Sequence, residues 1–313
     1  MENLLVILGP TASGKTQLSL QAAAKLNGEI ISGDSVQVYR GMDIGSAKLL
    51  ENERIFADKT IPHYLIDIKN PDENYTAAEF SQEARNLITQ INSEGKLPFL
   101  VGGTGFYLES VYGKHIFNDL PERNREFCDE LKQLGNEELH LRLSKIDAAA
   151  AERIHQNDTV RLVRALDVYY NHGMTPSEVI SQTDRLPSKE YRLFKCGIEF
   201  PREELYSRID RRVDIMMEQG LLHEVKTLLD QGYNLSHKSM NSIGYKQIAE
   251  YYDRQYDLET AVSLIKKESR HLAKRQLTWF RRDKEIRWYK TEEFSDMQSL
   301  YKHAIMDMTE FFK

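Results

Sequence analysis

The chain has 313 residues, of which 41% are hydrophobic and 29% charged, and its formal net charge is −6 at pH 7. This composition is typical of a folded protein with a sizeable core and argues against a protein coated in nucleic acid. Two distant cysteines without histidines at metal-ligand spacing argue against a disulfide framework and a structural zinc site. The apolar run at 4–8 is too short for a signal-peptide core, and no stretch reaches the ~18 residues of a membrane span. We therefore expect a cytoplasmic protein that does not enter a membrane.

Strand and helix patterns alternate in the first part of the chain. Strands are predicted at 4–8, 29–32, 64–68 and 98–101, and helices at 15–26, 76–92 and 105–112. This alternation is typical of a parallel sheet covered by helices on both faces. The predicted fold class is α/β, with a P-loop NTPase-like parallel sheet flanked by helices.

The strand signals stop between about 118 and 187, where charged, Leu- and Ala-rich helical sequence takes over, including the 3.6-residue period at 160–170. A strand is predicted again at 191–200, followed by helical stretches at 204–231 and 259–280 and a short strand at 286–289. We therefore predict a discontinuous core domain, residues 1–117 and 188–313, that carries an all-helical insertion domain, residues 118–187.

A phosphate-binding loop is the strongest motif. It follows the first predicted strand, matches G-x-x-x-x-G-K-[ST], and consists of Gly9, Pro10, Thr11, Ala12, Ser13, Gly14, Lys15 and Thr16. Such a loop turns successive backbone N–H groups toward anionic oxygens at the N-terminus of the next helix. Lys15 adds a charge, and the Thr16 hydroxyl suits a magnesium ion. The motif predicts a site for a di- or triphosphate.

Polar residues follow two further predicted strands. Asp34 begins the stretch Asp-Ser-Val-Gln after the second strand, and Thr104 follows two glycines after the fourth. Because the carboxyl ends of neighbouring strands form one crevice, Asp34 should face the phosphate loop. Asp34 has two interpretations of similar weight, a helix N-cap over Gln37 and a general base. The glycines before Thr104 would allow the backbone to approach a ligand closely, but by itself this stretch is better explained as an ordinary strand-to-helix turn.

The usual acid of a hydrolytic NTPase is missing at the end of the strand 98–101. Asp67 is the other candidate, and it is equally explained as a solvated strand end. Arg208 and Arg212 lie four residues apart on one helix face, where they can pair with nearby acids or form an arginine fork for a diphosphate.

Two clusters of basic residues interrupt the acidic average. Residues 266–290 hold ten Lys and Arg against three acids, together with Trp279 and other aromatics. Stacking on bases is one interpretation of the aromatics, but helical spacing favours burial of Trp279 in the core. A second cluster in the insertion contains Arg153, His155, Arg161 and Arg164.

Eight ordered motifs resemble the signatures of the tRNA dimethylallyltransferases, also called tRNA isopentenyltransferases. They are GPTASGKT, ISGDSVQVYRGMDIGSAK, PHYLIDI, LVGGTGFYL, RIHQNDTVRLVRALDVY, GLLHEVKTLL, SIGYKQI and AKRQLTWFRRD, and they span about residues 4–290. Ser46 stands where the family usually has threonine. The zinc-finger extension of eukaryotic members is absent, so the chain resembles the compact bacterial form.

The resemblance implies transfer of a dimethylallyl group from dimethylallyl diphosphate to N6 of the adenosine 3′ of the anticodon, in tRNAs that read codons beginning with U. Asp34 matches the general base, and Lys15 and Arg208 are expected to neutralise the leaving diphosphate, together with Mg²⁺ held through Thr16. The partners implied are the tRNA anticodon stem-loop and the diphosphate donor, and we expect a monomer.

The expected tRNA contacts fall into three groups. They are Asp34, Ser35, Val36, Gln37 and Thr104 at the crevice, Arg125, Val160, Arg161, Leu162, Val163 and Arg164 in the insertion, and Lys274 and Arg275 in the C-terminal basic segment. Three rival functions stay open: a P-loop small-molecule kinase, an adenylate isopentenyltransferase that uses free nucleotides, and an RNA-binding protein switched by a nucleotide.

Overall fold

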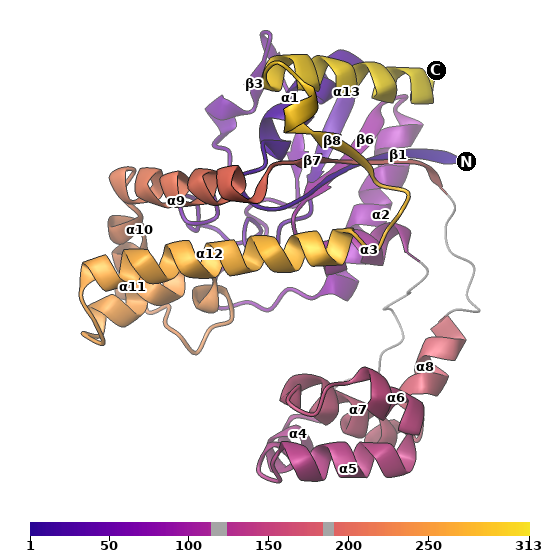
Figure 1. Cartoon of the computed structure of the whole chain (residues 1–313), viewed down its shortest axis with the longest axis vertical. Coiled ribbons are helices and arrows are strands. Elements are labelled where there is room, and N and C mark those ends of the chain that lie inside the picture. The colour runs from indigo at the N-terminus through magenta and orange to yellow at the C-terminus, as the bar shows by residue number, and fades with distance from the viewer. Residues whose placement is uncertain (114–123, 184–190) are drawn as a thin grey trace. The chain divides into compact units, whose positions relative to one another are not determined.

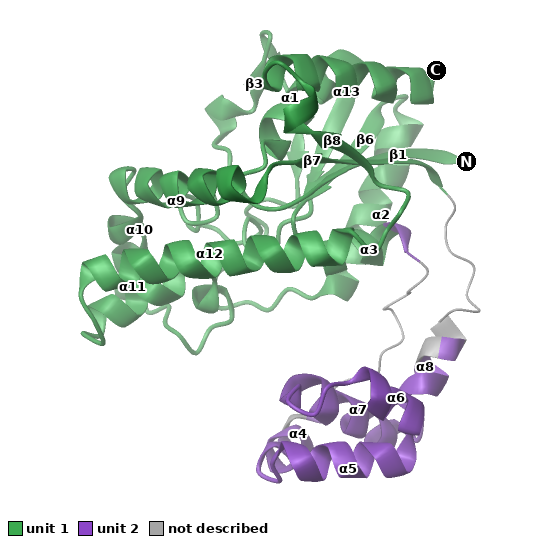
Figure 2. Cartoon of the chain, viewed as in Figure 1, with its two compact units in different colours: residues 1–111, 190–313 green, residues 112–189 purple. Residues whose placement is uncertain are grey.

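The computed structural model describes residues 1–113, 124–183 and 191–313 (Figure 1). The chain divides into two compact units (Figure 2): unit 1 comprises Met1–Val111 and Glu190–Lys313, and unit 2 comprises Tyr112–Lys189. The predicted boundaries at 117/118 and 187/188 lie outside the described residues. Among the described residues, no helix combines the length and the apolar character needed to cross a membrane.

A six-stranded sheet forms the centre of unit 1. Its strands are β1 (Glu2–Leu8), β2 (Gly28–Ser32), β5 (His63–Tyr64), β6 (Leu97–Gly102), β7 (Tyr191–Glu199) and β8 (Arg287–Lys290). The order is β5-β2-β6-β1-β7-β8, and every neighbouring pair is parallel, which confirms the predicted fold class. The short strands β3 (Ile55–Phe56) and β4 (Lys59–Thr60) form a separate antiparallel pair.

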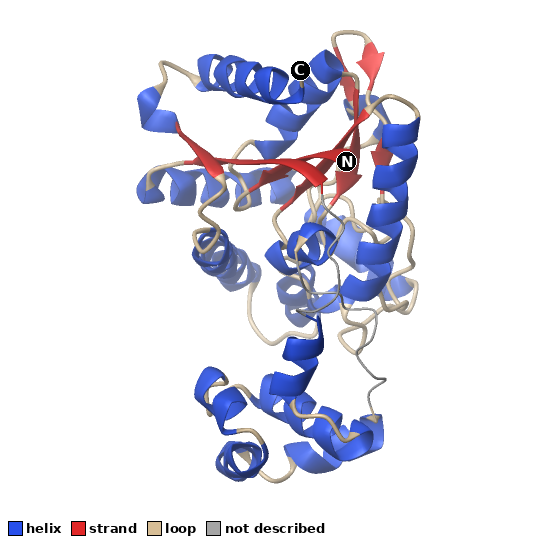
Figure 3. Cartoon of the chain, turned by 90° about the vertical axis from the view of Figure 1, so that its right-hand side faces the viewer, coloured by secondary structure: helices blue, strands red, loops and turns tan. Residues whose placement is uncertain are grey.

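The central strand β1 explains the uninterrupted apolar run near the N-terminus. It pairs with β6 on one side and β7 on the other, and its residues Leu4–Leu8 are 0% exposed. A parallel strand covered on both faces has no solvent side, so the sequence does not alternate between apolar and polar residues. Both faces of the sheet carry helices (Figure 3).

The helices of unit 1 form two sets. Around the sheet lie α1 (Lys15–Leu26), α2 (Ala77–Ser93), α3 (Gly105–Tyr112) and α13 (Met297–Phe312), with α1 packed on α13. A second set consists of α9 (Arg202–Glu218), α10 (Leu221–Asp230), α11 (Tyr245–Tyr252) and α12 (Leu258–Phe280), which share an apolar core with the segment 36–47. Short 3₁₀ turns lie at Glu51–Glu53, Ser239–Asn241 and Thr291–Glu293.

Two predicted elements differ from the structure, and two helices were not predicted. The expected helical stretch 204–231 is two helices, because Gly220 adopts φ 102° between α9 and α10. The expected strand 64–68 ends at Tyr64, since Leu65 and Asp67 have left-handed backbone conformations, φ 61° and 57°. Helices α11 and α13 were not predicted by the sequence patterns above.

Unit 2 is helical throughout its described part. It contains α4 (Arg125–Lys132), α5 (Asn136–Ile146), α6 (Ala148–Arg153), α7 (Thr159–His172) and α8 (Pro176–Thr183). Side chains of Asn124, Asp147 and Asp158 cap the N-termini of α4, α6 and α7 by accepting backbone hydrogen bonds. Its core is formed by Cys128 and Leu131 of α4 together with leucines, alanines and Val163 of α5, α6 and α7.

Candidate active site

The phosphate loop joins the buried strand β1 to helix α1. Gly14 is the N-cap of α1 with φ 85°, a conformation that favours glycine, and Ala12 is also left-handed with φ 62°. The Lys15 Nζ atom donates to the Pro10 carbonyl at 2.6 Å. Strain in a short loop at a helix N-terminus is typical of a functional site, here one suited to an anion.

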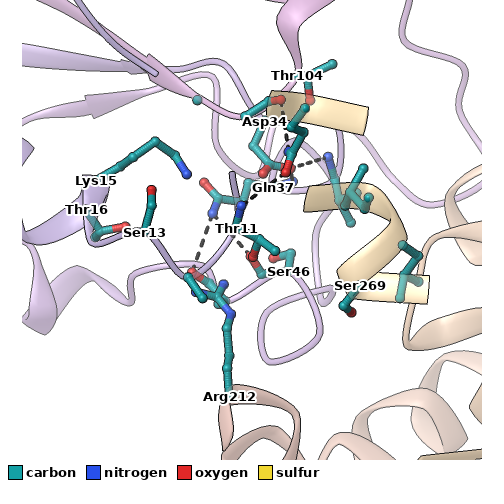
Figure 4. A pocket seen from close by; sticks show the side chains of 18 of the residues that line it. Thr11, Ser13, Lys15, Thr16, Asp34, Gln37, Ser46, Thr104, Arg212 and Ser269 are labelled. Atoms are coloured by element: carbon teal, nitrogen blue, oxygen red, sulfur yellow. Dashed lines mark hydrogen bonds between the residues drawn. The ribbon is translucent and has the colours of Figure 1, made fainter. Parts of the chain in front are cut away.

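A cavity of about 1200 Å³ opens beside this loop, and every residue that lines it belongs to unit 1. The walls include Thr11–Gln17 from the loop, Ser32 and Asp34–Gln37 after β2, and Val101–Phe106 after β6. Figure 4 shows Lys15, Asp34, Thr104 and Arg212 around this space. Sites for one small ligand usually measure roughly 300–1,000 Å³, so the cavity has room for two reactants.

Asp34 holds a turn rather than a helix. Its Oδ1 atom accepts from Val36 N at 2.8 Å and from Gln37 N at 3.4 Å, while the backbone of 34–38 forms bends and turns. The N-cap interpretation is therefore corrected to an Asx-type turn. Both hydrogen bonds use Oδ1, so the same carboxylate can keep the turn and accept a proton at its other oxygen.

Gln37 and Thr104 are tied to their surroundings at the cavity wall. Gln37 Oε1 accepts from Ser32 Oγ at 2.9 Å, and its Nε2 donates to Ser46 O at 3.3 Å and Ala47 O at 3.4 Å. Thr104 Oγ1 donates to Ser35 Oγ at 3.4 Å, which brings the end of β6 next to the turn after β2. The fold thus collects these side chains from separate strand ends.

The cationic side chains of Lys15 and Arg212 line the same cavity. Lys15 is partly buried, and its pKa is lowered from 10.5 to about 7, first by desolvation and second by the charge of Arg212, while Asp34 opposes this effect. Burial also lowers the pKa of Arg212, against the attraction of Asp34. Within the described residues, Arg212 Nε and Ser13 Oγ are buried polar atoms without a hydrogen-bond partner. Two cations and unpartnered polar atoms at one wall of the cavity favour the binding of an anion there.

Arg208 is held against the phosphate loop. Its Nε atom donates to Ala12 O at 3.0 Å, and its guanidinium lies 4.5 Å from the centre of the Phe200 ring. The acids of α9 pair with α12 instead: Asp210 with Arg270 and Asp214 with Lys266. This arrangement favours the anion-binding interpretation of the arginine pair over surface ion pairs on α9.

Helix α12 closes the cavity with residues whose roles the sequence did not reveal. Gln276 Nε2 donates to Gly103 O at 2.9 Å, and its Oε1 accepts from Thr11 N at 3.1 Å, so it bridges β6 to the phosphate loop. Trp279 lines the cavity, is partly buried, and donates to Glu109 Oε1 at 2.7 Å. The expected burial of Trp279 in the core is corrected accordingly. The sequence signal that could have indicated a role for Gln276 was its position as a polar residue among the apolar residues of this helix.

Known proteins share both the sequence and this architecture. A family model described as IPP transferase matches residues 37–283. A tRNA dimethylallyltransferase of Carboxydothermus hydrogenoformans is 46% identical over 291 residues, covering 92% of this chain and 92% of the relative. The tRNA dimethylallyltransferase of Halothermothrix orenii is 43% identical over 313 residues, covering 97% and 94%. The chain belongs to the tRNA dimethylallyltransferase family.

Solved structures of this family agree with that assignment. The full-length tRNA isopentenylpyrophosphate transferase of Bacillus halodurans matches with a TM-score of 0.73 and 41% identity, over 99% of this chain and 97% of that chain. A eukaryotic dimethylallyltransferase acting on tRNA matches with a TM-score of 0.84 and 29% identity, over 100% of this chain and 80% of that chain.

The residues present in this member of the tRNA dimethylallyltransferase family fit a magnesium ion held jointly with a ligand. Thr16 follows Lys15 at the start of α1 and lines the cavity. Among the described residues, no group of three or more His, Cys, Asp or Glu side chains forms a metal cage. Mg²⁺ commonly binds through few protein ligands plus phosphate oxygens and water. Asp67 does not line the cavity; it pairs with buried Lys48 at 2.5 Å.

The basic segment of this family member is partly neutralised by the fold. Five of its ten cations pair with acids: Lys266, Arg270, Arg281, Arg287 and Lys290. Lys274 and Arg275 are exposed on α12, and Arg275 also lines the cavity. Part of the apparent positive patch is therefore structural, and this pair at the cavity edge is accessible to an anionic partner.

The expected tRNA contacts in unit 2 are also divided. Val160 is 71% exposed and Arg161 is exposed at the start of α7, whereas Arg164 pairs with buried Asp167 at 2.5 Å. Leu162 and Val163 are 0% and 5% exposed because their side chains pack in the helical core, so their expected contact with tRNA stays a prediction that concerns the backbone at the start of α7. Arg125 begins α4, and its side chain lies outside the described residues.

Proposed function

We propose that this chain transfers the dimethylallyl group of dimethylallyl diphosphate to N6 of the adenosine 3′-adjacent to the anticodon in tRNAs that read codons beginning with U. The C1–O bond of the donor breaks, and its electron pair leaves with the diphosphate. The N6 lone pair forms the new bond to C1, and an N6 proton passes to a base. The products are N6-isopentenyladenosine in tRNA and diphosphate.

The phosphate loop and its cations would serve the donor. Charge grows on the diphosphate as the C–O bond breaks, so Lys15, Arg208 and the loop amides stabilise the transition state more than the ground state. Arg212 Nε, which is buried without a partner among the described residues, supports the same anion site. A magnesium ion bound through Thr16 and the diphosphate would neutralise further negative charge.

The turn after β2 would serve the acceptor. The exocyclic nitrogen of adenine is a poor nucleophile because its lone pair is delocalised, so a base that takes its proton assists attack. Asp34 is a carboxylate that lines the same cavity as Lys15 and Thr104. We assign proton acceptance to Asp34 and adenosine binding to Ser35, Val36, Gln37 and Thr104.

The tRNA stem-loop would be bound outside the cavity. The supporting features are the exposed cations Lys274 and Arg275 on α12 and Arg161 on α7. Arginine and lysine side chains at such positions commonly neutralise backbone phosphates. We propose that unit 2 contacts the anticodon stem-loop and that the enzyme acts as a monomer in the cytoplasm.

The observation that carries the proposal is the cavity itself, where a phosphate loop meets a carboxylate-bearing turn in a member of the tRNA dimethylallyltransferase family. A kinase would need a nucleotide and a phosphoryl acceptor in this space. A free-nucleotide prenyltransferase would have little use for accessible cations on two helices.

Nucleoside analysis tests the proposal directly. Purified protein is incubated with dimethylallyl diphosphate, Mg²⁺ and unmodified tRNA, and the tRNA is then digested and analysed by mass spectrometry. We expect N6-isopentenyladenosine, located at the position next to the anticodon by fragment mapping. Parallel reactions with AMP, and with ATP plus small acceptors, identify the rival enzymes; AMP turnover equal to that of tRNA would overturn the proposal.

A further inference from the structure

Glu224 accepts hydrogen bonds from the loop 43–47, which forms part of the cavity wall, on the side of the loop away from the cavity. It lies in the first turn of α10, and its Oε2 atom accepts from Asp43 N at 3.1 Å and Ile44 N at 2.7 Å. Its Oε1 atom accepts from Gly45 N at 3.2 Å and from the Tyr245 hydroxyl at 2.6 Å. Four donors therefore converge on one carboxylate, which has about four acceptor positions.

The captured loop is packed tightly against Tyr245. This tyrosine is 0% exposed, and a Cβ atom added to Gly45 would lie 2.5 Å from its ring. The glycine therefore allows the backbone to lie directly on the aromatic face. Glu224 does not line the cavity, whereas Gly45, Ser46 and Ala47 do. The Glu224 carboxylate therefore supports residues 45–47 without itself lining the cavity.

Hydrogen bonds connect this loop to the catalytic turn. The Ser46 and Ala47 carbonyls accept from Gln37 Nε2, and Ser32 Oγ donates to Gln37 Oε1. The backbone N–H of Gln37 in turn donates to Asp34 Oδ1. A displacement of residues 43–47 therefore changes the support of Gln37 directly and of Asp34 through it.

We propose that Glu224 is a positioning residue for the acceptor half of the reaction, acting through the loop 43–47 on Gln37 and Asp34. This inference rests on the proposed function. The phosphate loop is held separately, by Gln276 and Arg208. We therefore expect donor binding to depend little on Glu224.

The chemistry of the site requires a carboxylate rather than an amide. Glutamine in place of Glu224 keeps one acceptor oxygen and turns an NH₂ group toward backbone N–H donors. The two donors that lie opposite this NH₂ group lose their acceptor, so two of the four hydrogen bonds are lost. Hydrogen bonds to charged groups are stronger than neutral ones, so even an isosteric replacement frees the loop.

The test measures both substrates separately for Glu224→Gln. We expect kcat/KM for tRNA to fall roughly 10- to 100-fold, the scale of a misplacement of about 1 Å. Affinity for inorganic pyrophosphate should change by less than about twofold, because the sites are independently supported. Tyr245→Phe removes one of the four hydrogen bonds and should act in the same direction but less strongly. Glu203→Gln, an exposed acid in the first turn of α9, is the matched control and should behave like the wild type.

Hydrogen–deuterium exchange tests the loop without any activity. The amides of residues 43–45 should exchange faster in Glu224→Gln and as in the wild type in Glu203→Gln. Faster exchange with unchanged kcat and KM for tRNA would overturn the positioning role, as would an equal loss of tRNA and pyrophosphate binding. A wild-type protein that fails to modify tRNA refutes the proposed function instead, and unchanged amide exchange in the variant refutes the loop capture by itself.

Discussion

At the residue scale, Asp34 holds the turn after β2 and is also the proposed general base. Its Oδ1 atom accepts the two amide hydrogen bonds of the turn. Asp34→Asn keeps an acceptor at that position but cannot take a proton at neutral pH. We expect turnover to fall by roughly 10²–10⁴, the usual contribution of a positioned general base, with substrate affinities changed only a few-fold. Single-turnover assays with saturating tRNA measure this loss; near-normal turnover with a lower melting temperature would leave only the structural duty.

We expect Lys15 to make binding of the diphosphate donor depend on pH. In the free cavity its pKa is about 7, because burial and Arg212 disfavour the charged form. An anionic diphosphate beside Nζ raises that pKa again, so binding takes up a proton above about pH 7 and little below it. Lys15 also makes the stability of the free protein depend on pH. The unfolded chain binds more protons at Lys15 between pH 7 and 10.5, so this group makes the free protein more stable as the pH rises through that range.

Calorimetry measures the proton uptake at Lys15. Pyrophosphate is titrated at about pH 8 in two buffers of different ionisation enthalpy, and the wild type should take up more protons than Lys15→Arg, whose guanidinium stays charged. Pyrophosphate's own titration is common to both proteins and cancels in the difference. Equal uptake by both proteins would contradict the depressed pKa.

At the scale of elements, α12 carries two kinds of cationic side chain, those paired with acids of α9 and those exposed to solvent. Lys266 and Arg270 pair with acids of α9, whereas Lys274 and Arg275 are exposed near the cavity. Replacing the exposed pair by glutamate should raise KM for tRNA with little effect on the donor. Each phosphate contact removed should flatten the plot of log affinity against log salt by about 0.7–0.9.

A charge-matched control isolates the position of these cations. Glutamates in place of Lys25 and Lys302, both exposed on α1 and α13, change the net charge equally. Filter binding across a salt series should show a normal slope for this control. A slope that is the same in all three proteins would remove α12 from the tRNA interface.

Helix α7 makes a similar separation testable in unit 2. Arg161 forms an exposed ion pair with Asp158 at 3.3 Å, whereas Arg164 pairs with Asp167, whose side chain is 0% exposed. Arg164→Met leaves a buried carboxylate without its cation and should destabilise unit 2 by about 1–3 kcal/mol, while Arg161→Met should have almost no effect on stability. Urea unfolding monitored by amide exchange in 124–178 distinguishes them; equal stability of the two variants would contradict the assignment.

At the scale of the whole molecule, the cavity belongs to one of two compact units. A ligand that binds only the folded state stabilises it, by about 2.7 kcal/mol at 100 times Kd. Pyrophosphate with Mg²⁺ should therefore slow amide exchange in residues 9–16 and raise the melting temperature of unit 1, without protecting α5 or α7. Loss of the effect in Lys15→Ala supports the site, and uniform protection of both units would contradict a donor site confined to unit 1.

Local patterns predicted the elements whose signals are strong and contiguous. Three local patterns were each enough to predict an element: the apolar run of β1, the spacing of the phosphate loop and the periodicity of α7. Each pattern extends over only a few residues, and backbone geometry and burial act over the same range. Predictions were wrong where a backbone conformation intervened: Gly220 divides α9 from α10, and left-handed Leu65 ends β5.

The sequence by itself determined the fold class, the anion-binding loop and, through the order of eight motifs, the family. Only the tertiary structure decided which polar residues meet. It placed Gln276 between the phosphate loop and β6, turned Glu224 toward the loop 43–47, buried Leu162 and Val163, and paired half of the basic segment with acids. These contacts join residues up to hundreds of positions apart, and their partners depend on how helices pack. No local pattern carries that information, because a side chain's charge or polarity is the same whether it faces solvent, a neighbouring helix or a substrate.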